Sequence, residues 1–318
     1  MHIKSLKIFC DVVGCRSFSR AADANSISQS SASQTVHQLE ERLGVQLLDR
    51  SKRPFVVTAA GKLYYEGCRK LVQRLEALED NVRSLQHEVA GRVKVASIYS
   101  IGIGYMDQFV KDFLQRNPKA NVRLSYQHPS RVYELVENDQ VDVGLVSYPK
   151  SSRNILAIPW RDEPMVFVCS TDHPLAAHKT IQLSDLEGLD VVAFDQHLKI
   201  RQKIDKILAA NRVDVNVSME FDNIETLKRA LEINAGVSIL PEQTVSRELK
   251  SGTLSTATIA DHELIRPVGI IHRRNMKLGK TATEFIRLLQ EQTNIEQAPT
   301  MIGNTNVDSQ PPAEIAVS

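Results

Sequence analysis

Residues 17–41 constrain the fold of this chain more than any other stretch, because two short helical patterns lie on either side of a break. The first pattern holds three alanines within residues 21–24, which allow another helix to cross close by, and Ser19 can cap its start. Asn25 and Ser26 interrupt the pattern. The segment therefore predicts a helix-turn-helix, at about residues 18–37.

The second helix is expected from Gln29 to about Leu43, with Ser28 as its N-cap. Its apolar residues are spaced by four, three and four and predict one buried stripe: Ala32, Val36, Leu39 and Leu43. The opposite face carries hydroxyl, amide and imidazole side chains that can pair with base edges in a major groove: Gln29, Ser30, Ser33, Gln34 and His37. A solvated amphipathic helix in an ordinary bundle would show the same stripe.

A basic turn follows, because residues 45–57 alternate around Arg50, Lys52 and Arg53 as a two-stranded wing would. Residues 1–70 contain eleven Lys and Arg against six Asp and Glu, a net charge of +5, although the whole chain carries only +1. Phosphate contacts are expected from basic residues of this region: Arg20, Arg50, Lys52, Arg53 and Lys62. Each of them could instead be a solvated surface charge.

A long helix is predicted from Thr58, its cap, to about Val89. Its apolar residues alternate between spacings of four and three: Tyr64, Cys68, Leu71, Leu75, Leu78, Val82, Leu85 and Val89. This heptad stripe is narrower than the face of a helix on a globular core, so it favours a dimerising linker. The expected dimer contacts are Leu71, Leu75, Leu78, Val82 and Leu85.

From Arg92 onward, short β-rich runs alternate with helical patterns, which indicates an α/β domain. Strands are predicted at 93–97, 122–126, 141–147, 166–170, 191–194, 215–220, 237–240 and 268–272. Helices are predicted at 103–116, 131–138, 199–211, 224–234, 242–249 and 281–292. Residues 293–318 lose periodicity and gain Pro, Asn and Gln, so a disordered tail is expected.

Composition narrows the classes of protein. With 318 residues, 42% of them hydrophobic and 24% charged, two or three soluble globular domains are expected. There is no run of eighteen apolar residues and no apolar signal core at the start, so a cytoplasmic location is expected. The four cysteines form no Cys-x-x-Cys pair or zinc-like cluster, which predicts reduced thiols and no metal site.

Four motifs occur in order within residues 17–62: SFSRAAD, SISQSSAS, LEERLGVQLLDR and VTAAGK. Residues 2–66 thereby resemble the DNA-binding domain of the LysR-type transcriptional regulators, and the resemblance continues to about residue 292. Gln34 and His37 depart from it, because the family often has Arg or Lys there.

The resemblance implies a multidomain chain. A winged helix-turn-helix (residues 1–58) and a coiled-coil linker helix (59–90) would precede an α/β effector domain (91–292) with the two-lobed fold of periplasmic binding proteins. Lobe one would comprise 91–160 and 267–292, and lobe two 161–266, with crossings near 159–161 and 265–267. The implied partners are an operator duplex with an interrupted inverted repeat, a second copy or a dimer of dimers, a small-molecule effector and RNA polymerase, with no cofactor and no membrane.

An effector is expected between the lobes, where strands end and helices begin. The first strand runs into Ser97, Tyr99, Ser100 and Ile101, and in the family this loop commonly contacts the effector. Other loops add His128, Ser147, Asp195, Gln196 and Asn223. Any of these could be a plain turn residue or helix cap; in particular, Ser97 or Ser100 could cap the helix that follows.

A cleft enzyme and a solute receptor with a DNA-binding module are the alternatives to a regulator. The sequence contains no Gly-x-Ser-x-Gly, His-Glu-x-x-His, Gly-x-Gly-x-x-Gly or Walker motif, which argues against an enzyme. The lack of a signal core and the continuous linker argue against a receptor. We therefore expect a regulator without catalytic residues.

Overall fold

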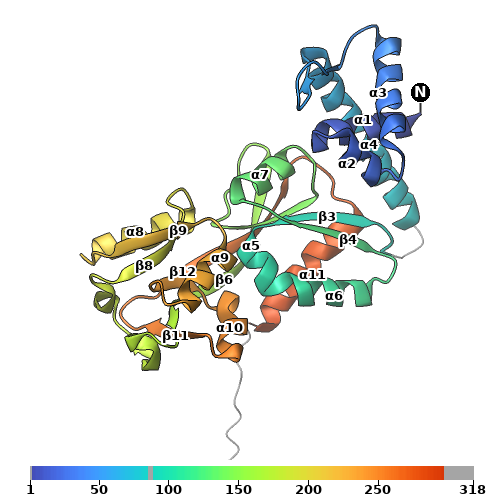
Figure 1. Ribbon diagram of the computed structural model, residues 1–318. Coiled ribbons are helices and arrows are strands. Elements are labelled where there is room, and N and C mark those ends of the chain that lie inside the picture. The colour runs from blue at the N-terminus through green and yellow to red at the C-terminus, as the bar shows by residue number, and fades with distance from the viewer. Residues whose placement is uncertain (1, 85–88, 297–318) are drawn as a thin grey trace, which may run out of the picture.

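The computed structural model describes residues 2–84 and 89–296 of the chain. A small helical domain at the N-terminus is joined by one long helix to a larger two-lobed body (Figure 1). No helix among these residues is long and apolar enough to cross a membrane.

The N-terminal domain consists of α1 (Ile3–Cys15), α2 (Phe18–Ala24), α3 (Gln29–Leu43), a two-stranded wing of β1 (Leu48–Asp49) and β2 (Val56–Val57), and the start of α4 (Ala59–Ser84). Their apolar faces share one core, which includes Phe9, Ala21, Val36 and Leu47. Ala21 and Ala22 of α2 are buried where this helix contacts α1 and α3, as the sequence predicted, whereas Ala24 is exposed.

Helix ends in this domain correct one expectation. Ser17, not Ser19, caps α2, because its hydroxyl accepts a hydrogen bond from the backbone N–H of Arg20 at 3.3 Å. Helix α1 ends at Cys15, and its C-cap, Arg16, has a left-handed backbone. Ser28 caps α3 and Gly44 ends it in the left-handed conformation, as expected.

The larger body has two lobes joined by two long antiparallel strands, β6 (Ile155–Ser170) and β12 (Ile265–Arg273). They pair from Ile155 with Arg273 to Pro164 with Ile265, with one shift of register between Val268 and Gly269, so both expected crossings fall within one ladder. The predicted strand at 166–170 is therefore only the second half of β6. This pairing gives the lobes a common spine (Figure 1).

Lobe one is built on the parallel strands β3 (Arg92–Ser97), β4 (Asn121–Tyr126) and β5 (Val143–Ser147), with β12 pairing antiparallel to β5. Helices α6 (Asp107–Arg116) and α11 (Lys280–Glu296) pack together through Phe109, Phe113 and Phe285. Helix α7 (Pro129–Glu137) packs against β5. Val89 packs into this core, so it does not extend the heptad stripe of α4.

Lobe two contains β8 (Asp190–Phe194), β9 (Asn216–Phe221), β10 (Ser238–Pro241) and β11 (Leu254–Ile259), together with α8 (Lys199–Ala210), α9 (Ile224–Glu232) and α10 (Ser246–Ser251). Strands β10 and β11 pair with β6. The sequence patterns missed β11 and the short β7 (Thr180–Ile181). The predicted helix at 242–249 is a 3-10 turn over Glu242–Val245 followed by α10.

The helix expected at 103–116 begins earlier, at α5 (Tyr99–Ile101), and passes through a π-helical turn over Gly102–Met106 before α6. Gly102 lies against the ring of Tyr126, and a Cβ atom there would come within 2.1 Å of that ring. Contact with the neighbouring strand therefore requires glycine at this turn.

Candidate functional site

The polar face of α3 is open to solvent. Gln29, Ser30, Gln34 and His37 are exposed and Ser33 is partly exposed, while Ala32, Val36 and Leu39 are buried. Leu43 departs from the predicted stripe, because its side chain is 38% exposed. Ser30 contacts the Ser28 hydroxyl at 2.9 Å, and His37 lies 3.3 Å from Glu41. The amide side chains of Gln29 and Gln34 are therefore open to solvent on this face.

The wing is anchored to α3 by a buried carboxylate, Glu40. Its Oε1 accepts hydrogen bonds from the backbone N–H groups of Leu47 (2.9 Å) and Leu48 (3.0 Å), and its Oε2 lies 2.9 Å from the Arg50 guanidinium. Arg50 also lies over the Phe18 ring, 5.6 Å from its centroid. Arg50 therefore stabilises the wing in addition to any phosphate contact.

The other predicted phosphate contacts on this domain are exposed, so a DNA backbone can reach them. Lys52 and Arg53 lie in the turn between β1 and β2, Arg20 lies on α2 and Lys62 lies on α4. Glu40 was not identified from the sequence, although an acidic residue beside Leu39 on the apolar side of α3 was a usable signal.

The heptad stripe of α4 divides into a buried and an exposed part. Tyr64 and Cys68, at the start of the stripe, pack in the core of the N-terminal domain. Leu75 is partly buried, whereas three other apolar side chains of the stripe are open to solvent: Leu71 (57% exposed), Leu78 (57%) and Val82 (58%). Leu85 lies outside the described residues.

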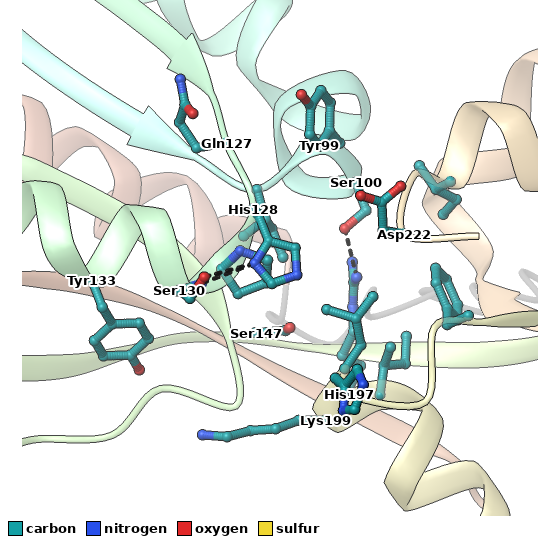
Figure 2. Close-up of a pocket in the computed structure, with 17 residues that line it drawn as sticks. Tyr99, Ser100, Gln127, His128, Ser130, Tyr133, Ser147, His197, Lys199 and Asp222 are labelled. Atoms are coloured by element: carbon teal, nitrogen blue, oxygen red, sulfur yellow. Dashed lines mark hydrogen bonds between the residues drawn. The ribbon is translucent and has the colours of Figure 1, made fainter. Parts of the chain in front are cut away.

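A cavity of about 260 Å³ opens between the two lobes, beside the spine strands. Four of the predicted effector contacts line it: Tyr99, Ser100, His128 and Ser147 (Figure 2). Gln127 and Asp222, which belong to the same predicted loops as His128 and Asn223, also line it. Residues that the prediction left out complete the wall, among them Ser130, Tyr133, His197, Lys199 and Arg266. The Tyr133 phenol is protonated at neutral pH and can donate a hydrogen bond, and burial raises its pKa further.

Five predicted contacts do not line this cavity. Ser97 is fully buried and donates its hydroxyl proton to the Ile98 carbonyl at 3.1 Å, and Ile101 is buried in lobe one. Asp195 accepts from the His197 N–H at 2.8 Å, and Asn223 caps α9. Gln196 is exposed outside the wall. Asp195 and Asn223 thus have the turn and cap roles that short polar residues often have at loop ends.

Ser100 is tied to a buried ion pair of the spine strands. The Arg266 guanidinium donates to the Ser100 hydroxyl at 2.7 Å and through Nε to Glu163 at 2.6 Å. Arg266 and Glu163 are each 2% exposed. Neither Ser97 nor Ser100 caps the helix that follows, because the N-cap of α5 is Ile98. Ser100 therefore fixes the orientation of the one arginine that lines the cavity.

Four helices begin at the cavity wall. Tyr99 and Ser100 open the three-residue α5, Pro129 and Ser130 open α7, Lys199 and Ile200 open α8, and Ile224 opens α9. The first turns of α7 and α9 are capped by His128 and Asn223, whereas the N-caps of α5 and of the longer α8 are Ile98 and Leu198, which have no side-chain acceptor. The N–H groups and positive end of α8 are thus available to an anion.

Comparison with known proteins identifies the family. Residues 3–62 match the model of the bacterial regulatory helix-turn-helix protein, lysR family, and residues 86–294 match that of the LysR substrate binding domain. The chain belongs to the LysR family of transcriptional regulators. It is therefore a sequence-specific DNA-binding regulator controlled by a small-molecule effector bound between the two lobes of its α/β domain.

Relatives in this LysR family cover most of the chain. The probable RuBisCO transcriptional regulator of Cyanophora paradoxa is 30% identical over 293 residues, covering 89% of each chain. The probable RuBisCO transcriptional regulator of Synechocystis sp. is 28% identical over 291 residues, covering 90% of this chain and 84% of that protein. These relatives are named as regulators rather than enzymes.

Solved structures share the fold. CbnR, a LysR family transcriptional regulator, superposes with a TM-score of 0.66 at 18% identity, covering 92% of this chain and 99% of that one. The regulatory domain of CcmR from Synechocystis, solved in complex with 2-PG, superposes with a TM-score of 0.58 at 22% identity, covering 64% of this chain and 97% of that one. The two-lobed body is thus the fold of a LysR-type effector domain.

Proposed function

We propose that the effector is a small organic anion that also carries a hydroxyl or amino group. The observation that carries this proposal is the start of α8 at the cavity wall without a side-chain cap, beside His197 and Lys199. Backbone N–H groups at a helix start bind anions, and the helix dipole favours negative charge there. Among small ligands, a carboxylate or phosphate fits this end of the cavity best.

The rest of the wall supports the second part of the proposal. Asp222 lies on the wall opposite the α7 side (Figure 2), and its carboxylate accepts hydrogen bonds but repels a second anionic group. A hydroxyl or ammonium group on the ligand satisfies it. The cavity volume of about 260 Å³ lies just below the usual range for drug-sized ligands, which favours a small metabolite.

His128 is a donor to this ligand. Its Nδ1 accepts from the Ser130 backbone N–H at 3.4 Å and contacts the Ser130 hydroxyl at 2.8 Å. A ring whose Nδ1 accepts carries its proton on Nε2 in the neutral form. Nε2–H can then donate a hydrogen bond to a ligand from lobe one while the α8 N-terminus binds it from lobe two.

The regulator acts as a homodimer or a dimer of dimers in the cytoplasm, without a cofactor, with RNA polymerase as a further partner. Leu71, Leu78 and Val82 form the α4 contact between protomers, and the exposed face of α3 reads an interrupted inverted repeat. A ligand that binds one arrangement of lobes better than another shifts the protomers on bent DNA.

Calorimetry with a panel of small hydroxy acids, amino acids and phosphate monoesters, each with its neutral methyl ester or amide, tests the effector chemistry. We expect saturable binding of an anion and none of its neutral counterpart. The His197→Ala variant should bind that anion about tenfold more weakly, the loss of one charge-assisted hydrogen bond. Its side chain is exposed, so the fold should be unaffected.

His178→Ala is the matched control, because His178 is an exposed histidine of lobe two outside the cavity. Equal affinity in His197→Ala and wild type, or tighter binding of the neutral counterpart, would remove the anion from the proposal. Loss of binding in both histidine variants would place the site elsewhere in lobe two.

A further inference from the structure

A second hollow, which we call the basic groove, lies on the spine strands next to the effector cavity. Its volume is about 780 Å³. One side is formed by residues 148–150 after β5 and by 159–162 of β6, with Pro267 and Val268 of β12, and the other by α8. The groove therefore spans lobe one, the spine and lobe two.

Positive charge dominates this groove. Five cationic side chains line it, from Lys150, Arg161, Lys199, Lys203 and Lys206, against one carboxylate, Asp162. In the described part of the chain, none of the four lysines lies within ion-pair distance of a carboxylate. Unlike most surface lysines, they are gathered around a concave surface.

The cation on the opposite side of α8, Arg201, is paired with carboxylates, unlike the lysines of the groove. Arg201 binds Asp205 at 2.7 Å and Glu220 at 2.6 Å. Lys199, Lys203 and Lys206 are spaced by four and three, so they share the groove face one turn apart. The carboxylates are thus confined to one side of α8, and the groove side is left positive.

Two of these cations, Lys150 and Lys199, are close enough to repel one another. Burial lowers the pKa of Lys199, and the nearby ammonium of Lys150 lowers it further. The Arg161 guanidinium is fixed by stacking, 4.2 Å from the Tyr105 ring centroid and 4.5 Å from that of Trp160. Such crowding is unfavourable in the free protein and is relieved by a bound polyanion.

We propose that the basic groove is a second ligand site, which shares only Lys199 with the effector cavity, for a small molecule carrying two or more phosphate groups. Lysine ammonium groups bind phosphate as point charges, and a fixed guanidinium adds directional donors. A single carboxylate or phosphate can pair with only some of the four lysines, so a polyphosphate or bisphosphate matches them better. Bound across the groove, it connects α8 to lobe one.

The test uses the full chain and inorganic tripolyphosphate as the probe, titrated in a calorimeter at low and at physiological ionic strength. We expect one saturable site per chain and a rise in the melting temperature, because a ligand that binds only the folded state stabilises it. The double variant Lys203→Gln/Lys206→Gln should bind at least about tenfold more weakly, since it loses two charge-assisted contacts. Both side chains are exposed, so folding should be retained.

Lys179→Gln/Lys250→Gln is the matched control: it removes the same charge from exposed lysines of lobe two outside the groove. This variant should bind the probe as wild type does. No saturable binding to wild type, or equal losses in the two double variants, would overturn the proposal.

Two further measurements distinguish a polyphosphate site in the groove from binding in the effector cavity and from a nucleic-acid contact. If His197→Ala loses tripolyphosphate binding and Lys203→Gln/Lys206→Gln keeps it, the probe occupies the effector cavity and the groove proposal fails. It also fails if the groove variant loses affinity for random-sequence DNA but not for tripolyphosphate, because the groove then contacts a nucleic-acid backbone. Neither result depends on identifying the effector.

Discussion

Replacing Glu40 by alanine should unfold the N-terminal domain far more readily than its position on a helix surface pattern would indicate. Its Oε1 accepts from the backbone N–H groups of Leu47 and Leu48, residues that are 1% and 2% exposed. A buried donor that loses a charged acceptor costs about 1.5–3 kcal/mol. Loss of the ion pair with the partly exposed Arg50 adds at most about 1 kcal/mol to this cost.

Together the two lost donors' bonds and the Arg50 pair amount to about 3–7 kcal/mol, a large part of the roughly 5–15 kcal/mol that stabilises an ordinary domain. The wing begins at the two released N–H groups, so its position against α3 should be lost first. Affinity for both operator and random DNA should fall with it, because Arg50, Lys52 and Arg53 are all carried by the wing.

Urea unfolding followed by two probes measures this effect, since a chain of several domains need not unfold in one step. Trp160 is the only tryptophan and is buried in lobe one, so its fluorescence reports the effector domain. Far-UV circular dichroism reports the helical N-terminal domain as well. Glu40→Ala should lower the urea midpoint of the N-terminal domain, which only circular dichroism detects, and leave the fluorescence midpoint unchanged.

Glu41→Ala is the control, because Glu41 is exposed and its carboxylate lies 3.3 Å from His37 on the solvent side of α3. Glu40→Gln keeps an acceptor oxygen without the charge and should fall between Glu40→Ala and wild type. If Glu40→Ala costs no more stability than Glu41→Ala, the carboxylate does not hold the wing, and the reasoning is wrong.

Three further predictions concern DNA binding, assembly and the cavity. Leu78→Lys should weaken self-association and operator affinity, because it places a charge in the α4 contact of each protomer. Light scattering compares it with the exposed-site control Glu66→Lys, which should assemble normally. Gln34→Ala should reduce the preference for operator over random DNA by about 1–3 kcal/mol. Arg53→Ala should weaken binding to both DNAs and reduce the slope of log affinity against log salt concentration by about one. Fluorescence anisotropy measured across salt concentrations would contradict this if the two variants behaved alike. Ser100→Ala should lower effector-domain stability by about 1–3 kcal/mol, because a buried arginine donor loses its acceptor; unchanged tryptophan-detected unfolding would mean that the hydroxyl is dispensable.

The Ser100 expectation differs from the one that local sequence supports. A hydroxyl where a strand ends and a helix begins predicts either a ligand contact, whose loss leaves stability unchanged, or a helix cap. In the structure it accepts from Arg266 across 166 positions of sequence and caps nothing. Its effect on a ligand therefore acts through the orientation of Arg266 as well as by direct contact.

Features that depend on neighbours within a turn or two of chain were predictable from the sequence. Ser28 and Gly44 bound α3 as expected, because capping involves residues three or four positions apart. The α4 stripe was predicted for the same reason, since heptad spacing is local. The motifs of residues 17–62 likewise indicated the family that the comparisons confirm.

The walls of both hollows were decided only by the tertiary structure. Arg266 and Glu163 are 103 positions apart and meet because β6 and β12 pair in one register, which no local pattern specifies. Asp195 and Asn223 look equivalent to Asp222 in the sequence, yet the first two make local turn and cap contacts and only Asp222 lines the cavity. Which loop-end side chains reach a cavity depends on how the lobes pack, because that packing sets the direction of each strand end.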